Sequence, residues 1–391
     1  MIDAEREILI HASDLSPDPD KMRSLLSREV DGNRLVEGAI REGLGGLLYR
    51  SLLKSNSLGS LQPMQRAVLE NAYYRTVRSN LILIQDLKEV LHELNQRKIR
   101  VVLLQGMDLL HSTYDDIGLR PLTDVDVWVR KEDYPAAVAL LGHLHYGSDP
   151  IYPTTFRKGS TTFDLHTQIL WADRIRSRKR LLDREDEEVF AKIRQIAVEG
   201  EEAFCLNPYD QFIYLGLHTL KHRANRLMWL VDLNTIVGAW EESDWQALSC
   251  RAKEMGQEKT VSCILYLLRK IFHAPLPDNV NRLPRLGPIE KKILEPRIQG
   301  NALPPWGPAF LFSTGKGLVK GLPIFLESLF PRPEILRQIF PESSDLGAPW
   351  LCFKRAVQLL GMLSTTISPQ RTPRTQREEK AEKGKSRRRE I

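Results

Sequence analysis

The sequence contains only four cysteines, and they are not spaced as a zinc site or a disulfide framework requires. Cys205, Cys250, Cys263 and Cys352 lie far apart, with no CxxC or CxxH pair among them. We therefore expect them to act as small apolar residues in a reducing compartment. This interpretation favours a cytoplasmic protein.

The chain also has few long apolar runs of the kind that lead a protein to or through a membrane. Its first residues, MIDAEREILIHASD, carry acids and lack the apolar centre of a signal peptide, so no leader is expected. The most apolar late stretch, GPAFLFSTGKGLVKGLPIFLESLF, is broken by lysines, glycines and a proline. We expect no transmembrane segment, and contact with a membrane surface is the lesser alternative.

Charge of the two signs is unevenly balanced along the chain, and most of the net positive charge lies near the C-terminal end. The chain carries 56 Lys and Arg against 50 Asp and Glu, a net charge of +6. Residues 369–391 hold nine Lys and Arg against four Glu, a net +5. With almost no apolar residues, this segment predicts a disordered basic tail over 367–391. A solvated tail is the simpler interpretation, and attachment to nucleic acid is the alternative, although no aromatic side chain there offers bases a platform.

The remaining composition is that of a globular chain, and its length allows two or three domains. Apolar residues at helical spacing predict helices between residues 20 and 98, ending in a long amphipathic helix that begins at Pro63. Helical patterns return after about residue 180, while residues 274–346 are too rich in proline and glycine to assign. We therefore expect helical regions on both sides of a core, with bounds of 1–98, 99–200 and 201–366.

The expected core is a small mixed sheet over about 100–170, which makes the fold class α+β. Residues 101–104 form a short apolar run that ends at Gly106, and a helix-like segment follows, which indicates strand, turn and helix. Two strand-like segments further on flank the turn Lys158-Gly159-Ser160, which favours an antiparallel hairpin.

Two aspartates, Asp124 and Asp126, stand one residue apart in the apolar stretch LRPLTDVDVWV (119–129). Successive side chains of a strand point to opposite faces, so these two carboxylates share one face. Like charges this close raise each other's pKa and are costly to bury unless a cation compensates them. A third acid, Asp164, lies in the later strand TTFDLH, and three carboxylates on one sheet face suit Mg²⁺.

A phosphate site is expected beside these acids. The turn in LLQGMDLL opens a helix, whose first backbone N–H groups favour anions. Two Mg²⁺ ions about 3.5–4 Å apart can orient nucleotide phosphates and activate an attacking hydroxyl.

The sequence resembles the polymerase-β-like nucleotidyltransferase superfamily, in particular a large uncharacterised bacterial nucleotidyltransferase family. That family has a leucine-rich strand ending at a glycine, then an R…D-h-D-h-h-V motif, then D-L-H. The counterparts here are VVLLQG (101–106), LRPLTDVDVWV (119–129) and FDLH (163–166), with further likeness at residues 215–222, 226–233 and 328–341. The resemblance implies a polymerase-β-like core, a small mixed sheet with helices, between N- and C-terminal helical regions.

The resemblance also implies a reaction: transfer of a nucleoside monophosphate from an NTP to an acceptor hydroxyl, with Mg²⁺, or alternatively Mn²⁺, as the cofactor. Asp124 and Asp126 would bind the metal, and Asp164 would be the third carboxylate, acting on the acceptor. Contacts with the nucleotide are implied for six further residues: Gln105, Gly106, Met107, Arg120, His166 and Lys221. The acceptor, whether a protein, a small molecule, a sugar or an RNA, stays open, as does the choice of NTP.

Several of these residues have simpler interpretations. His166 could hold a carboxylate by a hydrogen bond, and Lys221 could be a solvated helix residue. Asp232 lies in an apolar helix, and we expect it to form a structural pair with a basic partner such as His218 or His222.

The sequence departs from the family pattern at the turn. Gln105 replaces a lysine, and Met107 stands where a serine is usual, so two groups that hold triphosphate oxygens are absent. The alternative function is therefore a degenerate, non-catalytic protein that binds a nucleotide or a partner.

Overall fold

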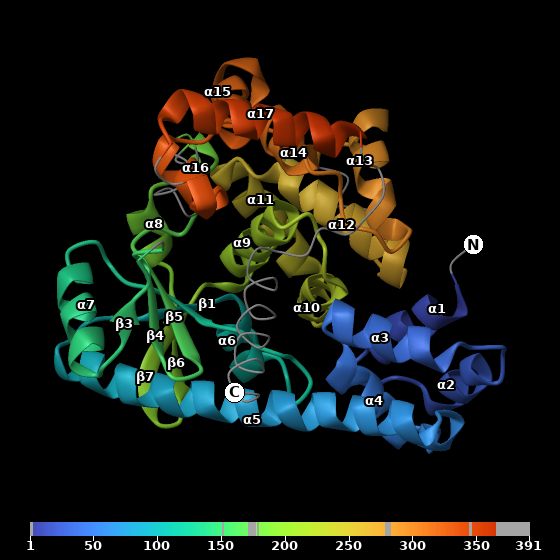
Figure 1. The fold of residues 1–391 in the computed structure, drawn as a ribbon. Coiled ribbons are helices and arrows are strands. Elements are labelled where there is room, and N and C mark those ends of the chain that lie inside the picture. The colour runs from blue at the N-terminus through green and yellow to red at the C-terminus, as the bar shows by residue number, and fades with distance from the viewer. Residues whose placement is uncertain are drawn as a thin grey trace, which may run out of the picture.

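One seven-stranded mixed sheet lies at one side of the molecule, with helices packed around it (Figure 1). This computed structural model describes residues 3–150, 152–170, 177, 180–277, 283–343 and 346–364. The predicted basic tail, 367–391, lies outside the described residues. A single hydrophobic core runs through the described residues, from the N-terminal helices through the sheet to the C-terminal helices.

The sheet has the strand order β3-β4-β5-β2-β1-β7-β6. The strands are β1 (Val102–Leu104), β2 (Val125–Trp128), β3 (Gly147–Ser148), β4 (Thr155–Lys158), β5 (Thr161–His166), β6 (Arg194–Val198) and β7 (Glu201–Cys205). β1 pairs antiparallel with β2 and parallel with β7, while β2 pairs parallel with β5. The predicted mixed sheet is confirmed, and so is the hairpin: β4 and β5 are antiparallel, and Gly159 in their turn has a φ of +58°.

The predicted limit of the sheet near residue 170 is wrong. An antiparallel hairpin, β6-β7, follows the short helix α8 (Asp186–Phe190) and adds two strands beside β1. Its turn, Glu199-Gly200, has positive φ at both residues, 49° and 87°. The expected boundary at residue 200 therefore falls inside a hairpin, and the sheet reaches Cys205.

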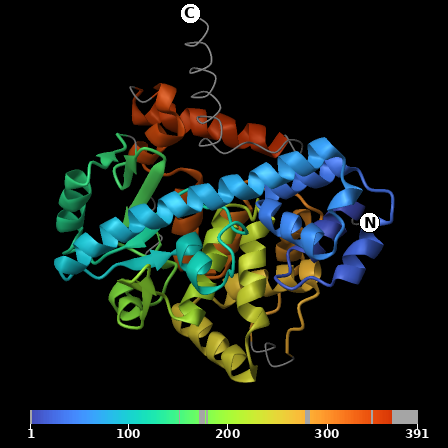
Figure 2. The ribbon, with the colours of Figure 1, turned by 90° about the horizontal axis from the view of Figure 1, so that it is seen from below.

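The N-terminal helices form a bundle that is joined to the sheet by one long helix. They are α1 (Ala4–Ala12), α2 (Pro19–Leu26), α3 (Gly32–Glu42), α4 (Gly45–Lys54) and α5 (Pro63–Gln96). Seen from below, α5 crosses the molecule from this bundle to the sheet, where it contacts β5 and β7 (Figure 2). The predicted long amphipathic helix is thus confirmed, and it holds the bundle and the sheet in one body.

The C-terminal helices pack above the sheet and the bundle in Figure 1. They are α9 (Pro208–Lys221), α10 (Leu227–Gly238), α11 (Glu242–Met255), α12 (Glu258–Phe272), α13 (Pro288–Ile298), α14 (Gly307–Thr314), α15 (Gly317–Leu329), α16 (Pro333–Ile339) and α17 (Ala348–Ser364). Four of them, α13 to α16, occupy the segment that the sequence left unassigned. Within the described residues, no helix is both long and apolar enough to cross a bilayer.

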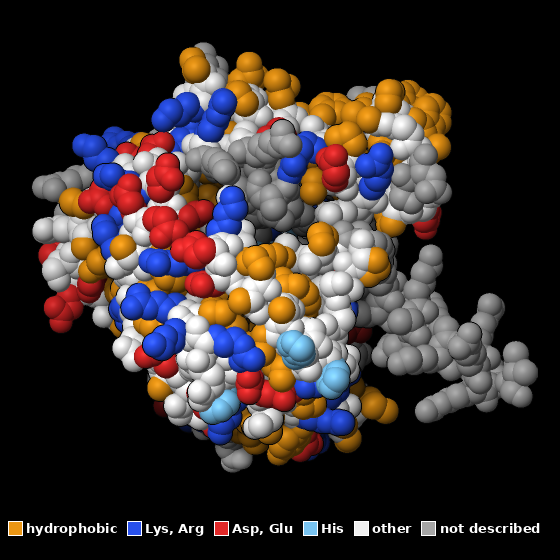
Figure 3. All heavy atoms as spheres, turned by 90° about the vertical axis from the view of Figure 1, so that its left-hand side faces the viewer, with side chains coloured by type: hydrophobic (Ala, Val, Ile, Leu, Met, Phe, Trp, Pro, Cys, Tyr) orange, Lys and Arg blue, Asp and Glu red, His pale blue; other side chains and the backbone are white. Residues whose placement is uncertain are grey.

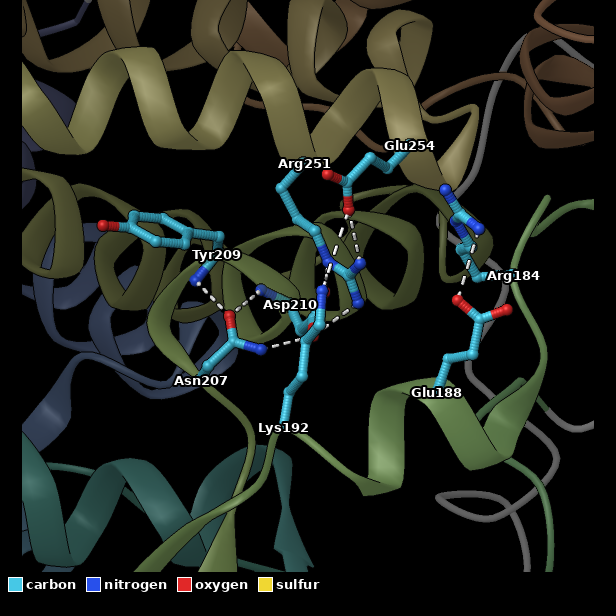
Figure 4. Close-up of polar contacts among 8 residues, drawn as sticks. All are labelled: Arg184, Glu188, Lys192, Asn207, Tyr209, Asp210, Arg251 and Glu254. Atoms are coloured by element: carbon cyan, nitrogen blue, oxygen red, sulfur yellow. Dashed lines mark hydrogen bonds and ion pairs between the residues drawn. The ribbon is translucent and has the colours of Figure 1, made fainter.

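Helix α9 is fixed at its start by a cap and a buried ion pair (Figure 4). The Asn207 side chain accepts hydrogen bonds from the backbone N–H groups of Tyr209 and Asp210, as its position before Pro208 predicts. Arg251 of α11 donates from Nε to Asp210 Oδ1 at 2.6 Å, and both side chains are almost fully buried. These contacts fix the direction of α9, whose other end lies near the candidate site.

Candidate active site

Three adjacent strands bring two of the predicted acids, Asp126 and Asp164, and the predicted turn into one row, and Asp124 directly precedes β2 at the same place. Leu104, the last residue of β1, is the register partner of Asp126 on β2, and Asp126 is the partner of Asp164 on β5. Since α6 (Gln105–Ser112) starts directly after Leu104, its first turn lies beside Asp126. The prediction that Asp126 and Asp164 share one sheet face is therefore confirmed by their register.

Each carboxylate of the row has a polar neighbour. His166 Nε2 lies 2.9 Å from Asp126 Oδ1, where the imidazole N–H donates to the carboxylate. Thr155 on β4 donates its hydroxyl to Asp164, and Thr123 donates to Asp124 at 2.9 Å. His166 therefore holds a carboxylate by a hydrogen bond, which is one of the two roles that the sequence left open for it.

Burial and charge shift the pKa values of Asp126 and His166. Burial, and to a lesser degree the charge of Asp124, raise the pKa of Asp126 to about 6, although the bond to His166 opposes the rise. Burial lowers the pKa of His166, but the hydrogen bond and negative charge of Asp126 outweigh it, so this pKa lies above its usual value. A raised pKa among the clustered acids is thus confirmed, with burial rather than repulsion as its main cause.

The turn at the start of α6 differs from its expected form. The residue with a left-handed backbone is Gln105, with a φ of 55°, and Gly106 is already helical. Gly106 is needed for space instead: a Cβ there would lie 2.1 Å from Arg120 Nη1 and 2.4 Å from a methyl group of Leu122. The glycine therefore lets the 119–122 segment pass close beneath the helix.

Gln105 and Met107, two of the predicted nucleotide contacts, differ in how far their side chains are buried. The Gln105 side chain is half-buried and donates to the Tyr214 hydroxyl at 3.3 Å. The Met107 side chain is buried in the core, so only its backbone N–H is a candidate for the phosphate site. Tyr214, on α9, is a neighbour of the site that no local sequence pattern indicated.

Arg120 lies beside Gly106, as expected, but its charge is already paired. Its guanidinium donates to Asp232 of α10, with Nη2 2.8 Å from Oδ2, and both side chains are buried. Tyr114 also donates to Asp232, at 2.6 Å. The predicted pairing of Asp232 with a basic partner is therefore confirmed, but the partner is Arg120 and not His218 or His222, because the fold brings this arginine close.

Lys221, the last residue of α9, brings a positive charge near the site. Burial is the main cause that lowers the pKa of His218, and the charge of Lys221 adds to it; the same charge only weakly opposes the raised pKa of His166. The rings of His218, His222 and Trp229 pack against one another, with centroids 4.5–5.5 Å apart. The end of α9 thus contributes positive charge next to the carboxylates.

Asp108, on α6, gives the first testable prediction. Burial raises the pKa of its carboxyl to about 7, and among the described residues Oδ1 has no hydrogen-bond partner while Oδ2 accepts from Gln211. Folding therefore favours the protonated form, so this group costs stability progressively as the pH rises from 3.8 to about 7. The variant Asp108→Asn is expected to gain on the wild type across that window by up to about 1.4 kcal/mol per pH unit.

The measurement is urea unfolding of both proteins at several pH values. The test is how the stability difference between the two proteins changes with pH, because any fixed cost of the new amide is the same at every pH. A stability difference that stays constant from pH 4 to pH 8 would show that Asp108 is ionised in both states.

The donor atoms of the row fit Mg²⁺ in their chemistry. The carboxylates of Asp124, Asp126 and Asp164 offer only oxygen ligands, which hard divalent cations prefer. Across the described part of the chain, however, no three or more His, Cys, Asp or Glu side chains are arranged to hold a metal ion. Instead, each of the three acids accepts a hydrogen bond through one oxygen, Asp126 from His166, Asp164 from Thr155 and Asp124 from Thr123.

The fold and this row of residues define an α+β protein with an acidic site where neighbouring strands of its sheet meet a helix N-terminus. A family model described as uncharacterised nucleotidyltransferase matches residues 28–273, which is more than half of the chain. The chain therefore belongs to this nucleotidyltransferase family, and the predicted resemblance is confirmed over that segment. A search of curated proteins found no match.

Proposed function

We propose that the protein transfers a nucleoside monophosphate from an NTP to a hydroxyl group of an acceptor and releases pyrophosphate. The acceptor oxygen forms a bond to the α-phosphorus, the bond between that phosphorus and the pyrophosphate oxygen breaks, and the hydroxyl proton passes to a carboxylate. The observation that carries the proposal is the register of Leu104, Asp126 and Asp164, in a chain of the nucleotidyltransferase family.

The residues of the row have distinct roles in this proposal. Asp124, Asp126 and Asp164 would hold Mg²⁺, which when bound neutralises phosphate charge and makes the acceptor hydroxyl easier to ionise. Asp164, held by Thr155, accepts the hydroxyl proton. His166 keeps the buried Asp126 carboxylate ionised and oriented through its hydrogen bond.

The phosphates have positive partners on both sides. Helix α6 begins beside Asp126. The first backbone N–H groups of a helix have no partner within it and carry partial positive charge, so they favour an anion at this end of α6. Lys221 supplies a full positive charge from the end of α9.

A cavity next to His166 supports a separate place for the acceptor. It has a volume of about 350 Å³ and a mainly apolar surface, and side chains with polar ends line it as well, among them Lys131, Tyr134, Thr154, Thr167 and Gln168. Its size suits a small molecule or one side chain or sugar of a larger acceptor.

The proposal is tested by labelling. The purified protein is incubated with each NTP carrying a label on the α-phosphate, with Mg²⁺ or Mn²⁺ and a cell lysate as the source of acceptor. We expect label to enter an acceptor from the α-position, not from the γ-position, and chelation of the metal to prevent it. Transfer of a γ-label would indicate phosphoryl transfer and overturn the proposal.

A non-catalytic nucleotide-binding protein is the second candidate. It is favoured by the buried Met107 side chain, by the engagement of Gln105 with Tyr214, and by carboxylates that are bonded to neighbours. This candidate predicts that an NTP raises the melting temperature while no NTP gives any labelled product.

A further inference from the structure

Two C-terminal helices expose apolar side chains along one face each. On α15 and at its end these are Val319, Leu322, Leu326 and Phe330, and on α17 they are Trp350, Phe353 and Val357. Val319 is 88% exposed, and the other six are between 43% and 57% exposed. Figure 3 shows hydrophobic side chains gathered at the top of the molecule, where these helices lie.

The spacing makes each set a continuous stripe. Positions 319, 322, 326 and 330 are separated by three or four residues, as are 350, 353 and 357, so each set lies on one side of its helix. The Trp350 and Phe353 rings stack with centroids 5.2 Å apart, which holds two large aromatic groups side by side at the surface. Arg355 of α17 donates to the carbonyl of Leu329 at the end of α15, so the two helices are neighbours, and exposed apolar stripes on neighbouring helices indicate an interaction surface.

The net positive charge of the sequence is concentrated in and after α17. Residues 346–391, which begin just before α17, contain eleven Lys and Arg against four Glu, a net +7. Since the whole chain has a net charge of +6, residues 1–345 together carry −1. The apolar stripe on α17 therefore belongs to the part of the chain that accounts for its net positive charge.

We propose that the exposed faces of α15 and α17 dock on a lipid surface rich in anionic headgroups. An amphipathic helix lies in the plane of such a surface with its apolar side among the acyl chains, and aromatic side chains favour that boundary. Nearby Lys and Arg residues add attraction to anionic lipids, and stable attachment needs two signals of this kind. The stripes supply the first signal, and the +7 segment supplies the second.

The same charge argues against a second copy of the chain as the occupant. In a two-fold symmetric dimer the same patch meets itself, so Lys354 and Arg355 of α17 would be brought toward the same cations of the other copy. An anionic bilayer attracts that charge instead.

The experiment is vesicle co-sedimentation of the full chain. Vesicles are phosphatidylcholine alone or phosphatidylcholine with about one third phosphatidylglycerol, a fraction that gives a strongly negative surface. We expect binding to the anionic vesicles, weak binding to the neutral ones, and weakening at high salt because the charges are screened.

Two variants and one control separate the stripes from exposed apolar residues in general. Leu322→Asp and Phe353→Asp are each expected to lower the partition coefficient onto anionic vesicles about tenfold or more, because a carboxylate then enters the interface. Met64→Asp, at a 74% exposed methionine of α5, should bind as the wild type does. All three positions are exposed, so circular dichroism should show unchanged folding.

Several results would overturn the proposal. One is equal binding to neutral and anionic vesicles, and another is equal loss in all three variants. A third is a dimer in analytical ultracentrifugation that Leu322→Asp and Phe353→Asp dissociate, because the stripes would then join two copies. The assay uses no nucleotide, so its outcome is independent of the proposed transfer reaction.

Discussion

Replacing Asp126 by asparagine is expected to abolish nucleotidyl transfer and leave the fold intact. The substitution keeps the shape of the side chain but removes one of the charges that would hold Mg²⁺. A metal that stabilises transition-state charge contributes several kcal/mol, so we expect labelling to fall by at least about a thousandfold. Mg²⁺ with NTP should also lose its effect on the melting temperature of the variant.

The stability of Asp126→Asn tests whether the buried Asp126 carboxylate destabilises the folded protein. Burial raises the pKa of Asp126 to about 6, so at neutral pH the folded protein bears the cost of a charged, buried carboxylate. The amide removes that cost and can still accept a hydrogen bond from His166, so the melting temperature should stay level or rise.

Asp115→Asn is the matched control for Asp126→Asn, because the side chain of Asp115 is 71% exposed and pairs with Arg50 away from the row. We expect this variant to keep both its activity and its stability. If Asp126→Asn unfolds while the wild type binds no nucleotide, Asp126 is a structural residue, and the proposed function is wrong.

Replacing Arg120 by methionine is expected to destabilise the protein by about 3–5 kcal/mol, because the variant leaves the Asp232 carboxylate charged, buried and without its cation. The guanidinium and the carboxylate are 6% and 1% exposed, so water cannot take the place of the lost partner. Arg130→Met is the control: its pair with Glu187 is long, at 3.7 Å, and lies at the surface, where such pairs contribute less than about 1 kcal/mol.

A double-mutant cycle assigns the effect to the ion pair. In Arg120→Met/Asp232→Asn the buried charge is gone and Tyr114 keeps an acceptor, so most of the lost stability should return. Urea unfolding of the four proteins gives the coupling energy. If Arg120→Met instead keeps its stability but loses nucleotide affinity, the guanidinium binds the nucleotide, as the family resemblance implied.

Local patterns in the sequence predicted the parts of the site that depend on neighbours in the chain. The alternation of acids and valines at Asp124 and Asp126 indicated a strand face, and the glycine turn after Lys158 indicated the hairpin that carries Asp164. The same holds for α9, whose start follows from Asn207 and Pro208. Each of these signals lies within a few residues of what it predicts.

Contacts between distant segments could not be predicted in this way. Arg120 and Asp232 are 112 residues apart, so their pairing depends on where the fold places α10. Tyr214 reaches Gln105 for the same reason, across 109 residues. These positions carry no pattern of their own, and only the complete fold shows them.

The unassigned segment 274–346 was missed for a different reason. Its prolines looked like helix breakers, but Pro288, Pro308 and Pro333 lie in the first turn of α13, α14 and α16. Proline is tolerated there because the first N–H groups of a helix have no partner within it. The hairpin β6-β7 was missed because the strand Arg194–Val198 is largely exposed and lacks a clear apolar alternation.

The place of β1 in the sheet has a consequence for synthesis on the ribosome. β1 can pair with β2 as soon as residue 128 has emerged, but its other neighbour, β7, begins only at Glu201. Until then an apolar strand keeps an unpaired edge, and such edges readily pair with strands of other chains. While the intervening residues are translated, the nascent chain therefore depends on α5, already complete, or on a chaperone to shield the strand that leads into the candidate active site.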